Sequence, residues 1–146
     1  MKNKGIVIVV VLILGGLLYW QASVKSKSEM ESFALQEKCA KNAEEFFNYF
    51  VTDLTKRQTD EFSNHYNLKL NKCFVLITHY MGNAHGMYTQ DLYDAVEKKV
   101  YGSYAWQSQD GKKFWEVPPI TCEMLGKTCF SEDEFNAFVK DYMQEK

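Results

Sequence analysis

The chain begins with an uninterrupted run of apolar residues. No charged side chain occurs between Lys4 and Lys25, a gap of 20 residues made mostly of valine, isoleucine, leucine and glycine. At about 1.5 Å per residue, a helix of this length just crosses a hydrocarbon core of roughly 30 Å. The pattern predicts an uncleaved transmembrane signal-anchor over residues 1–23, in contact with the lipid bilayer through residues 5–22, and a polar tether over residues 24–28.

A cleaved signal peptide is the alternative interpretation of this run. Cleavage after Ala22 would place the bulky Trp20 three residues before the cut, where a small residue is preferred. The first cysteine, Cys39, lies too far downstream for a lipoprotein signal. The anchor is therefore preferred, and the rest of the chain is expected in the periplasm or outside the cell, held at a bacterial inner membrane by a single pass.

A helical period follows the tether. Apolar side chains recur at three- and four-residue spacing from Phe33 to Leu54, and polar or charged side chains fill most positions between them. This pattern predicts one long helix over about residues 29–56, with its apolar stripe in the core. A coiled coil with a partner is the alternative, but the stripe is short and keeps no strict heptad.

The middle of the chain alternates apolar runs with turn signals. Residues 64–78 end in a nearly unbroken apolar run and are interpreted as a central strand that becomes buried on both faces. Three further strands are expected, over residues 88–96, 100–107 and 114–117. Because the connections between them are short, the pattern predicts a four-stranded antiparallel meander.

The C-terminal segment carries the signals of a second helix. Ser131 followed by Glu134 is typical of a capping box, and an apolar stripe then extends over residues 132–144. The elements together predict an α+β fold: a transmembrane helix, a long helix, a four-stranded antiparallel meander and a C-terminal helix. Residues 29–146 are expected to form one domain, with the helices packed on one face of the sheet.

Four cysteines follow the export segment, and an even number in this context predicts two disulfides. Cys122 and Cys129 flank a short loop and are expected to pair locally. That leaves Cys39 on the long helix and Cys73 on the central strand, while the other two connectivities remain open.

Charge and motifs exclude several functions. The formal net charge is −2, which provides no broad basic face for a nucleic acid. The chain has no Gly-x-Ser-x-Gly, no phosphate-binding glycine loop and no zincin motif. We therefore expect no catalytic residue, no cofactor and no nucleic-acid partner.

One group of side chains suggests metal chemistry. His79, Met81, His85 and Met87 lie close together in the sequence after the central strand. Imidazole and thioether groups suit copper, Cu(I) in particular. An ordinary connector between two strands is the alternative interpretation of these residues.

A binding surface is the other candidate. Tyr104 and Trp106 share one face of a strand because side chains alternate, and His65 with Tyr66 lies near the start of the central strand. Tyrosine and tryptophan are favoured at interaction sites. The expected function is a membrane-tethered, extracytoplasmic, non-catalytic binding domain for an envelope protein or a glycan. The alternative is a small envelope enzyme or copper-handling protein that uses His65 or the His/Met group.

Several strings along the chain carry a resemblance. His65–Phe74, Asp94–Ala95, Tyr104–Trp106 and Trp115–Pro119 resemble a group of small uncharacterised bacterial envelope proteins. The likeness covers about residues 37–143 and contains no catalytic motif. It implies bacterial origin and export, and it transfers no activity or site residue to this chain.

Overall fold

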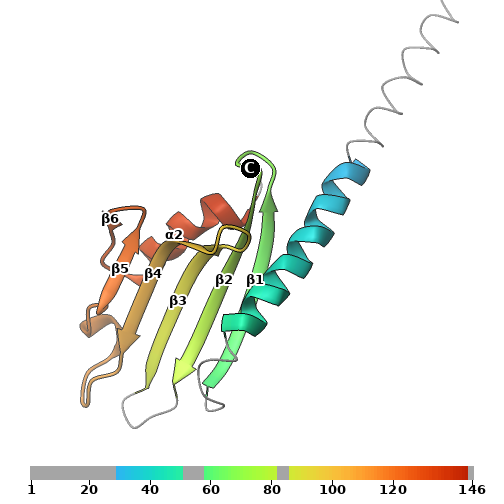
Figure 1. The fold of residues 1–146 in the computed structure, drawn as a ribbon. Helices are drawn as coiled ribbons and strands as arrows, with labels where there is room; N and C mark the ends of the chain where they lie inside the picture. The colour runs from blue at the N-terminus through green and yellow to red at the C-terminus, as the bar shows by residue number, and fades with distance from the viewer. Residues whose placement is uncertain (1–28, 51–57, 82–85, 145–146) are drawn as a thin grey trace, which may run out of the picture. The chain divides into compact units, whose positions relative to one another are not determined.

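The computed structural model describes residues 29–50, 58–81 and 86–144 (Figure 1). The chain divides into two compact units, Met1–Leu35 and Gln36–Lys146. In the first unit the described residues, 29–35, are helical. The second unit contains the continuation of this helix over residues 36–50, a sheet, a short 3-10 helix and a C-terminal helix.

The sheet has six antiparallel strands whose order in space follows the sequence. The elements are β1 (Gln58–Asn67), β2 (Lys72–Met81), β3 (Met87–Asp94), β4 (Lys99–Gln107), the 3-10 helix η1 (Phe114–Glu116), β5 (Thr121–Met124), β6 (Lys127–Thr128) and α2 (Glu132–Met143). The predicted fold class is therefore wrong in its number of strands. The predicted fold class also included a transmembrane helix, and this part is wrong for the described fold. No helix within residues 29–50, 58–81 and 86–144 is long and apolar enough to cross a membrane. Residues 1–28, to which the anchor and tether are assigned, lie outside the described residues.

The predicted central strand is in fact a hairpin. Strand β1 pairs with β2 from Gln58↔Met81 to Asn67↔Lys72, and the turn between them contains Asn71 at φ 53°. Asparagine tolerates this left-handed backbone better than most residues. The sequence pattern missed β1 because this edge strand is mostly polar and contributes few apolar side chains to the core.

The sequence also misplaced the last strands. Residues 114–117, expected as a strand, contain the 3-10 helix η1. The pair β5–β6 lies instead in the segment expected as a loop, where Leu125 and Gly126 both have positive φ angles of 47° and 79°. Two left-handed residues between paired strands define a tight type I′-like hairpin turn, which the search for long apolar runs does not detect.

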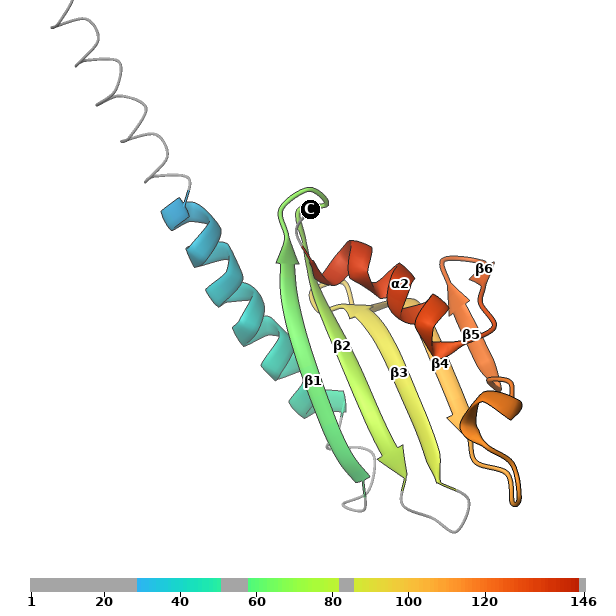
Figure 2. The ribbon, with the colours of Figure 1, turned by 180° about the vertical axis from the view of Figure 1, so that it is seen from behind.

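The two helices pack on opposite faces of the sheet, and the expectation that they share one face is wrong. Figures 1 and 2 view the sheet from its two sides and show a different helix in front each time. On one face, Cys39, Ala43 and Phe46 of the first helix pack in a cluster with Val75 and Ile77 of β2. On the other face, the cluster contains these residues: Phe74, Leu92, Tyr104, Phe135 and Val139.

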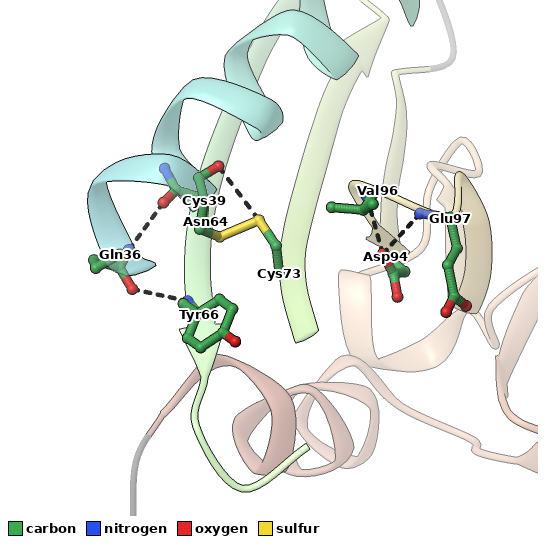
Figure 3. Close-up of a disulfide and its surroundings, with 8 residues drawn as sticks. All are labelled: Gln36, Cys39, Asn64, Tyr66, Cys73, Asp94, Val96 and Glu97. Atoms are coloured by element: carbon green, nitrogen blue, oxygen red, sulfur yellow. Dashed lines mark hydrogen bonds between the residues drawn. A yellow bond between two sulfur atoms is a disulfide. The ribbon is translucent and has the colours of Figure 1, made fainter. Parts of the chain in front are cut away.

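Both disulfides have the predicted pairing. Cys39 is bonded to Cys73 with a Cα–Cα distance of 5.3 Å, and Cys122 to Cys129 with a distance of 5.0 Å. The first bond links the helix to β2, as Figure 3 shows, and both cysteines are buried. Beside it the Gln36 amide bridges to the sheet edge, since its Nε2 donates to Asn64 Oδ1 and its Oε1 accepts from the Tyr66 backbone N–H.

The start of α2 follows the predicted capping signal. Ser131 Oγ accepts a hydrogen bond from the Glu134 backbone N–H at 3.2 Å. The Glu134 carboxylate accepts from the backbone N–H of Phe130 at 2.7 Å, one residue before the position in a capping box. At the other end, Asn67 Nδ2 donates to the carbonyl oxygens of Asp141 and Tyr142. The first contacts cap the start of the helix, and Asn67 attaches its end to β1.

Candidate binding surface

Four aromatic side chains lie in a line across the sheet on the face that carries α2. Tyr80 of β2 and Tyr88 of β3 are register partners, and Tyr88 is also the register partner of Trp106 in β4. The ring centroids of Tyr80 and Tyr88 are 5.1 Å apart. Phe114 of η1 continues the line, with its centroid 4.7 Å from that of Trp106. We call these four residues the aromatic row.

The aromatic row lies next to the buried core of this face and is itself accessible. Tyr104, two residues from Trp106 on the same side of β4, is 1% exposed and packs on Phe135 of α2 with centroids 5.7 Å apart. By contrast, Tyr80 is 44% exposed and Phe114 is 43% exposed. Tyr88 and Trp106, between them, are partly exposed. Figure 2 shows α2 crossing this face near the end of the sheet that holds the β1–β2 turn. Tyr80, Tyr88 and Trp106 each lie one residue from the opposite ends of β2, β3 and β4.

The polar atoms of Tyr88 and Trp106, two of the four residues in the row, are engaged within the protein. The Tyr88 hydroxyl donates to Glu132 Oε1 at 3.0 Å, and Trp106 Nε1 donates to the carbonyl oxygen of Val117 at 3.1 Å. Burial, and then the hydrogen bond to Glu132, raise the pKa of the Tyr88 hydroxyl, so it remains a neutral donor. The rings of Tyr88 and Trp106 are therefore held in place, and their donors are occupied.

Acceptor groups lie beside the aromatic row. Glu132 brings a carboxylate to Tyr88, and Glu61 of β1 is exposed on the same face, opposite Thr78 in the register. Gln90, two residues after Tyr88 on the same face of β3, is buried, and its Oε1 has no hydrogen-bond partner within the described residues. A buried acceptor without a partner is rare in folded proteins.

The predicted surface of His65, Tyr66, Tyr104 and Trp106 is not one surface. His65 and Tyr66 are neighbours in β1, so their side chains point to opposite faces, and Tyr66 packs against the cluster around Cys39. Tyr104 is buried in the core. Trp106 is the one predicted residue that belongs to the aromatic row. The register of the strands brings Tyr80 and Tyr88 beside Trp106, and η1 brings Phe114 there; neither is visible in the sequence.

The His/Met group is distributed over two strands. His79 lies inside β2, and Met81 at its end is the register partner of Met87 at the start of β3. His85 lies outside the described residues. Among residues 29–50, 58–81 and 86–144, no group of three or more His, Cys, Asp and Glu residues could hold a metal ion.

His79 forms a buried polar pair with the edge strand. Its Nδ1 lies 2.7 Å from Asp60 Oδ1, the two side chains are 7% and 5% exposed, and the Phe50 ring stacks on the imidazole at 5.7 Å. Nearby, burial raises the pKa of the Asp91 carboxyl, while a hydrogen bond from Ser103 and the charge of His79 act against the increase. A general base must reach the proton that it removes, and the imidazole of His79 is enclosed by protein. The pair attaches β1 to β2.

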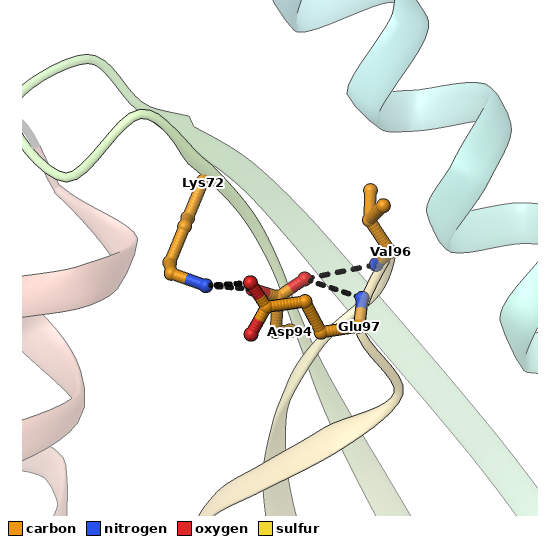
Figure 4. Close-up of polar contacts among 4 residues, drawn as sticks. All are labelled: Lys72, Asp94, Val96 and Glu97. Carbon is orange, nitrogen blue, oxygen red and sulfur yellow. Dashed lines mark hydrogen bonds and ion pairs between the residues drawn. The ribbon is translucent and has the colours of Figure 1, made fainter.

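A second polar group holds the β3–β4 turn. Asp94 Oδ1 accepts from the backbone N–H groups of Val96 and Glu97, both at 2.9 Å, and its Oδ2 lies 2.7 Å from Lys72 Nζ, as Figure 4 shows. Burial opposes ionisation of Asp94, but the N–H groups and the ammonium together outweigh it. The pKa of Asp94 therefore lies below its ordinary value. This arrangement is that of a turn-stabilising aspartate.

Two hollows occur in the described surface. One of about 520 Å³ lies between the β1–β2 turn and the end of α2, with these residues around it: Asn67, Leu68, Lys69, Leu70, Asp141, Tyr142 and Gln144. The other, of about 280 Å³, lies between the first helix and the β3–β4 turn, and Tyr49, Val96 and Lys98 are among the residues around it. Neither hollow contains a residue of the aromatic row.

Fold and surface together define a disulfide-linked α+β domain with an open row of aromatic side chains. Compared with known proteins, the chain matches no protein-family model, no curated protein and no solved structure.

Proposed function

We propose that this protein is a non-catalytic binding domain of the bacterial envelope that acts outside the cytoplasm. The observation that carries the proposal is the aromatic row. Single exposed apolar residues are common on protein surfaces, but adjoining ones that form a patch are typical of interaction sites. Tyrosine and tryptophan in particular supply large rigid contact areas at little cost in side-chain entropy.

The structure around the aromatic row supports binding without rearrangement. Three of its rings stand on neighbouring strands of one sheet, and two of them are fixed by hydrogen bonds to Glu132 and Val117. A rigid surface loses little conformational entropy when it binds, so more of the contact energy appears as affinity. The two disulfides support a location in an oxidising compartment, because such bonds are rare in reducing cytosol.

A sedimentation experiment tests the proposal. The full chain, purified with its disulfides formed, is mixed with insoluble cell-wall polymer isolated from bacteria, and bound protein is measured in the pellet. The double variant Tyr80→Ala/Phe114→Ala removes the two most exposed rings of the aromatic row. The matched control, Tyr49→Ala/Phe130→Ala, removes a tyrosine that is 71% exposed and a phenylalanine that is 79% exposed elsewhere in the domain.

We expect the wild-type protein and the control variant to sediment with the polymer, and the row variant to remain in solution. Because all four substituted residues are well exposed, each variant should keep the fold, which circular dichroism checks. Sedimentation of all three proteins to the same extent, or of none of them, would contradict the proposal that the aromatic row is the binding surface.

A further inference from the structure

We infer that one end of the sheet docks on the surface of an anionic lipid bilayer. This inference goes beyond the aromatic row and does not depend on it. In an antiparallel meander alternate connections lie at the same end, so the β1–β2, β3–β4 and β5–β6 turns lie together. Figure 1 shows these three turns at the upper end of the sheet. We call residues 68–71, 96–100 and 125–127 the turn surface.

Aliphatic side chains are exposed in all three turns. They are between 43% and 62% exposed, and they are these residues: Leu68, Leu70, Val96, Val100 and Leu125. A single exposed apolar residue is ordinary, but five that gather at one end of a sheet are typical of an interaction site. The interface of a bilayer takes up apolar side chains of this kind.

The β1–β2 turn holds its leucines in a fixed conformation. The backbone N–H of Leu70 donates to Asn67 Oδ1 at 3.0 Å, and Asn67 Nδ2 donates to two carbonyl oxygens at the end of α2. Asn71 completes the turn with a left-handed backbone, at φ 53°. A turn that is already ordered loses little conformational entropy when its leucines enter the interface.

Lysines accompany the aliphatic residues in every turn. The turn surface contains four exposed lysines: Lys69, Lys98, Lys99 and Lys127. Its one carboxylate, Glu97, has Oε1 2.6 Å from Lys72 Nζ. Four lysines and one glutamate give an excess of three positive charges, in a chain whose formal net charge is −2. Such lysines attract anionic headgroups while their methylene groups lie among apolar side chains.

The connection between β4 and β5, at the opposite end of the sheet, has no excess of charge. Two lysines and two carboxylates lie in it: Asp110, Lys112, Lys113 and Glu116. Trp115 and Ile120 are exposed in this connection. Attraction to an anionic surface needs a net positive charge, so the turn surface is the end that an anionic bilayer selects.

The path of the chain brings the turn surface within reach of lipid. Gln36 bonds to Asn64 and Tyr66 near the end of β1, so residue 36 lies at the same end of the sheet as the turn surface. Lys25, which ends the uncharged apolar run, precedes Gln36 by 11 residues. This length of chain spans at most about 40 Å. When the run is embedded in a bilayer, the turn surface is held close to it, and weak contacts are then sufficient for docking.

Docking through the turn surface directs the aromatic row away from the bilayer. Tyr80 follows Lys72 by eight residues along β2, which is about 26 Å at 3.3 Å per residue. The row therefore faces the aqueous space, where a ligand can reach it.

Fluorescence quenching by brominated lipid tests the inference. The full chain is reconstituted into vesicles of phosphatidylcholine, with or without phosphatidylglycerol, and the quencher is a lipid brominated near the headgroup end of its acyl chains. Leu70→Trp places a tryptophan on the turn surface. Tyr80→Trp is the matched control, because the replaced side chains are 43% and 44% exposed at opposite ends of the sheet. The signal of the native tryptophans is measured in the wild-type protein and subtracted.

We expect the tryptophan added by Leu70→Trp to be quenched in vesicles that contain phosphatidylglycerol, and much less in phosphatidylcholine alone. The tryptophan added by Tyr80→Trp should be quenched in neither. Raising the salt concentration should weaken the quenching in the Leu70→Trp variant, since salt screens the attraction between lysines and headgroups.

A charge variant in the Leu70→Trp background tests the lysines. Lys69→Gln/Lys98→Gln/Lys127→Gln removes one lysine from each turn. Because each lysine near an anionic surface contributes roughly a fivefold preference, the ratio of docked to free domain should fall about hundredfold. The control Lys41→Gln/Lys112→Gln/Lys113→Gln removes three exposed lysines elsewhere and should leave the quenching unchanged. Circular dichroism checks that each variant keeps the fold.

Several results would overturn the inference. Quenching that is absent, or equal in the two lipid compositions, would exclude an anionic bilayer as the partner. Equal quenching in Leu70→Trp and Tyr80→Trp would show that the turn surface is not the docked end. A blue shift of the Leu70→Trp emission in detergent that grows with protein concentration would assign the turn surface to a second copy of the chain. None of these results bears on the aromatic row, which sedimentation with cell-wall polymer tests separately.

Discussion

Removing the Cys39–Cys73 disulfide should destabilise the domain more than removing the Cys122–Cys129 disulfide. The first bond joins residues 34 positions apart and links the helix to β2, whereas the second joins residues 7 positions apart within the β5–β6 hairpin. The matched perturbations are the double variants Cys39→Ala/Cys73→Ala and Cys122→Ala/Cys129→Ala. Each removes one bond and leaves the other in place.

The magnitude follows from the loop that each bond closes in the unfolded chain. In the chain-entropy model, a loop of 34 residues corresponds to about 3.8 kcal/mol of stability and a loop of 7 to about 2.4 kcal/mol. Burial points the same way, because Cys39 and Cys73 are 1% and 3% exposed within the core cluster under the helix. The expected difference between the two variants is therefore about 1.4 kcal/mol.

Urea unfolding of the full chain measures this difference. With a slope of roughly 1.5 kcal/mol per molar urea, typical of a small domain, losing about 3.8 kcal/mol moves the midpoint by about 2.5 M. A loss of about 2.4 kcal/mol moves it by about 1.6 M. The two variants should have similar slopes, which shows that the comparison concerns stability alone.

Two results would refute the reasoning. Equal midpoints for the two variants would mean that loop length does not decide the effect. A larger loss from the hairpin bond would mean that attachment of α2 through Cys129 matters more than attachment of the first helix. Reduction of the wild-type protein with dithiothreitol is the control, since it should lower the midpoint at least as far as either variant.

Three further predictions concern the polar groups and tyrosines. Asp94→Asn should lower the free energy of unfolding by about 1–3 kcal/mol at neutral pH. The loss should become smaller in acid, because the pKa of Asp94 is lower in the folded protein than its ordinary value of 3.8. The stability that this shift adds is present above pH 3.8 and is lost as the pH falls through the pKa of the folded state. Urea midpoints of both proteins over this range measure it, and a constant difference would contradict the assigned cause. Burial raises the pKa of Tyr104 to about 12. The stability that this shift adds should be fully present below about pH 10 and should be lost as the pH rises toward 12, while tyrosinate absorbance increases. Ionisation of the tyrosine without loss of stability would contradict this. His79→Ala should cost about 3 kcal/mol because Asp60 is left buried without its partner, and adding Asp60→Ala should recover part of the loss in a double-mutant cycle; additive losses would show that the pair is not coupled.

The helices and disulfides could be predicted from the sequence because their signals are local. The three-to-four-residue period predicts the first helix, and Ser131 with the apolar stripe after it predicts α2 to within one residue. The pairing of Cys122 with Cys129 follows from proximity, and the other pair follows by elimination.

The arrangement of the helices on the two faces of the sheet is less local, but the sequence of β2 contains one signal of it. Val75 and Ile77 point to one face of β2 and Phe74 to the other, and all three are fully buried. A strand that is apolar on both sides needs cover on both sides, so the two helices had to lie on opposite faces. Strand β1 could not be found in this way, because an edge strand needs few apolar residues.

The aromatic row depends on strand register, which a single sequence does not show. Tyr80, Tyr88 and Trp106 become neighbours only when β2, β3 and β4 are aligned as they are, and a shift of one residue would move an aromatic ring to the other face. Phe114 joins them because η1 replaces the expected strand. Tyr104 could not be separated from Trp106, since burial by α2 decides between them.

The same contacts that build the domain explain why the aromatic row remains open. Helix α2 has 12 residues and is about 18 Å long, too short to cover the whole face of the sheet. Its start is fixed by the Ser131 cap and the neighbouring Cys122–Cys129 bond, and its end by the two hydrogen bonds from Asn67. It therefore cannot slide toward Tyr80 without breaking one of these attachments. Glu132, at the first turn of α2, holds the Tyr88 hydroxyl and so orients a ring that the helix does not cover. The domain thus exposes aromatic rings at a place that its core cannot bury, which is the arrangement that a preformed binding surface requires.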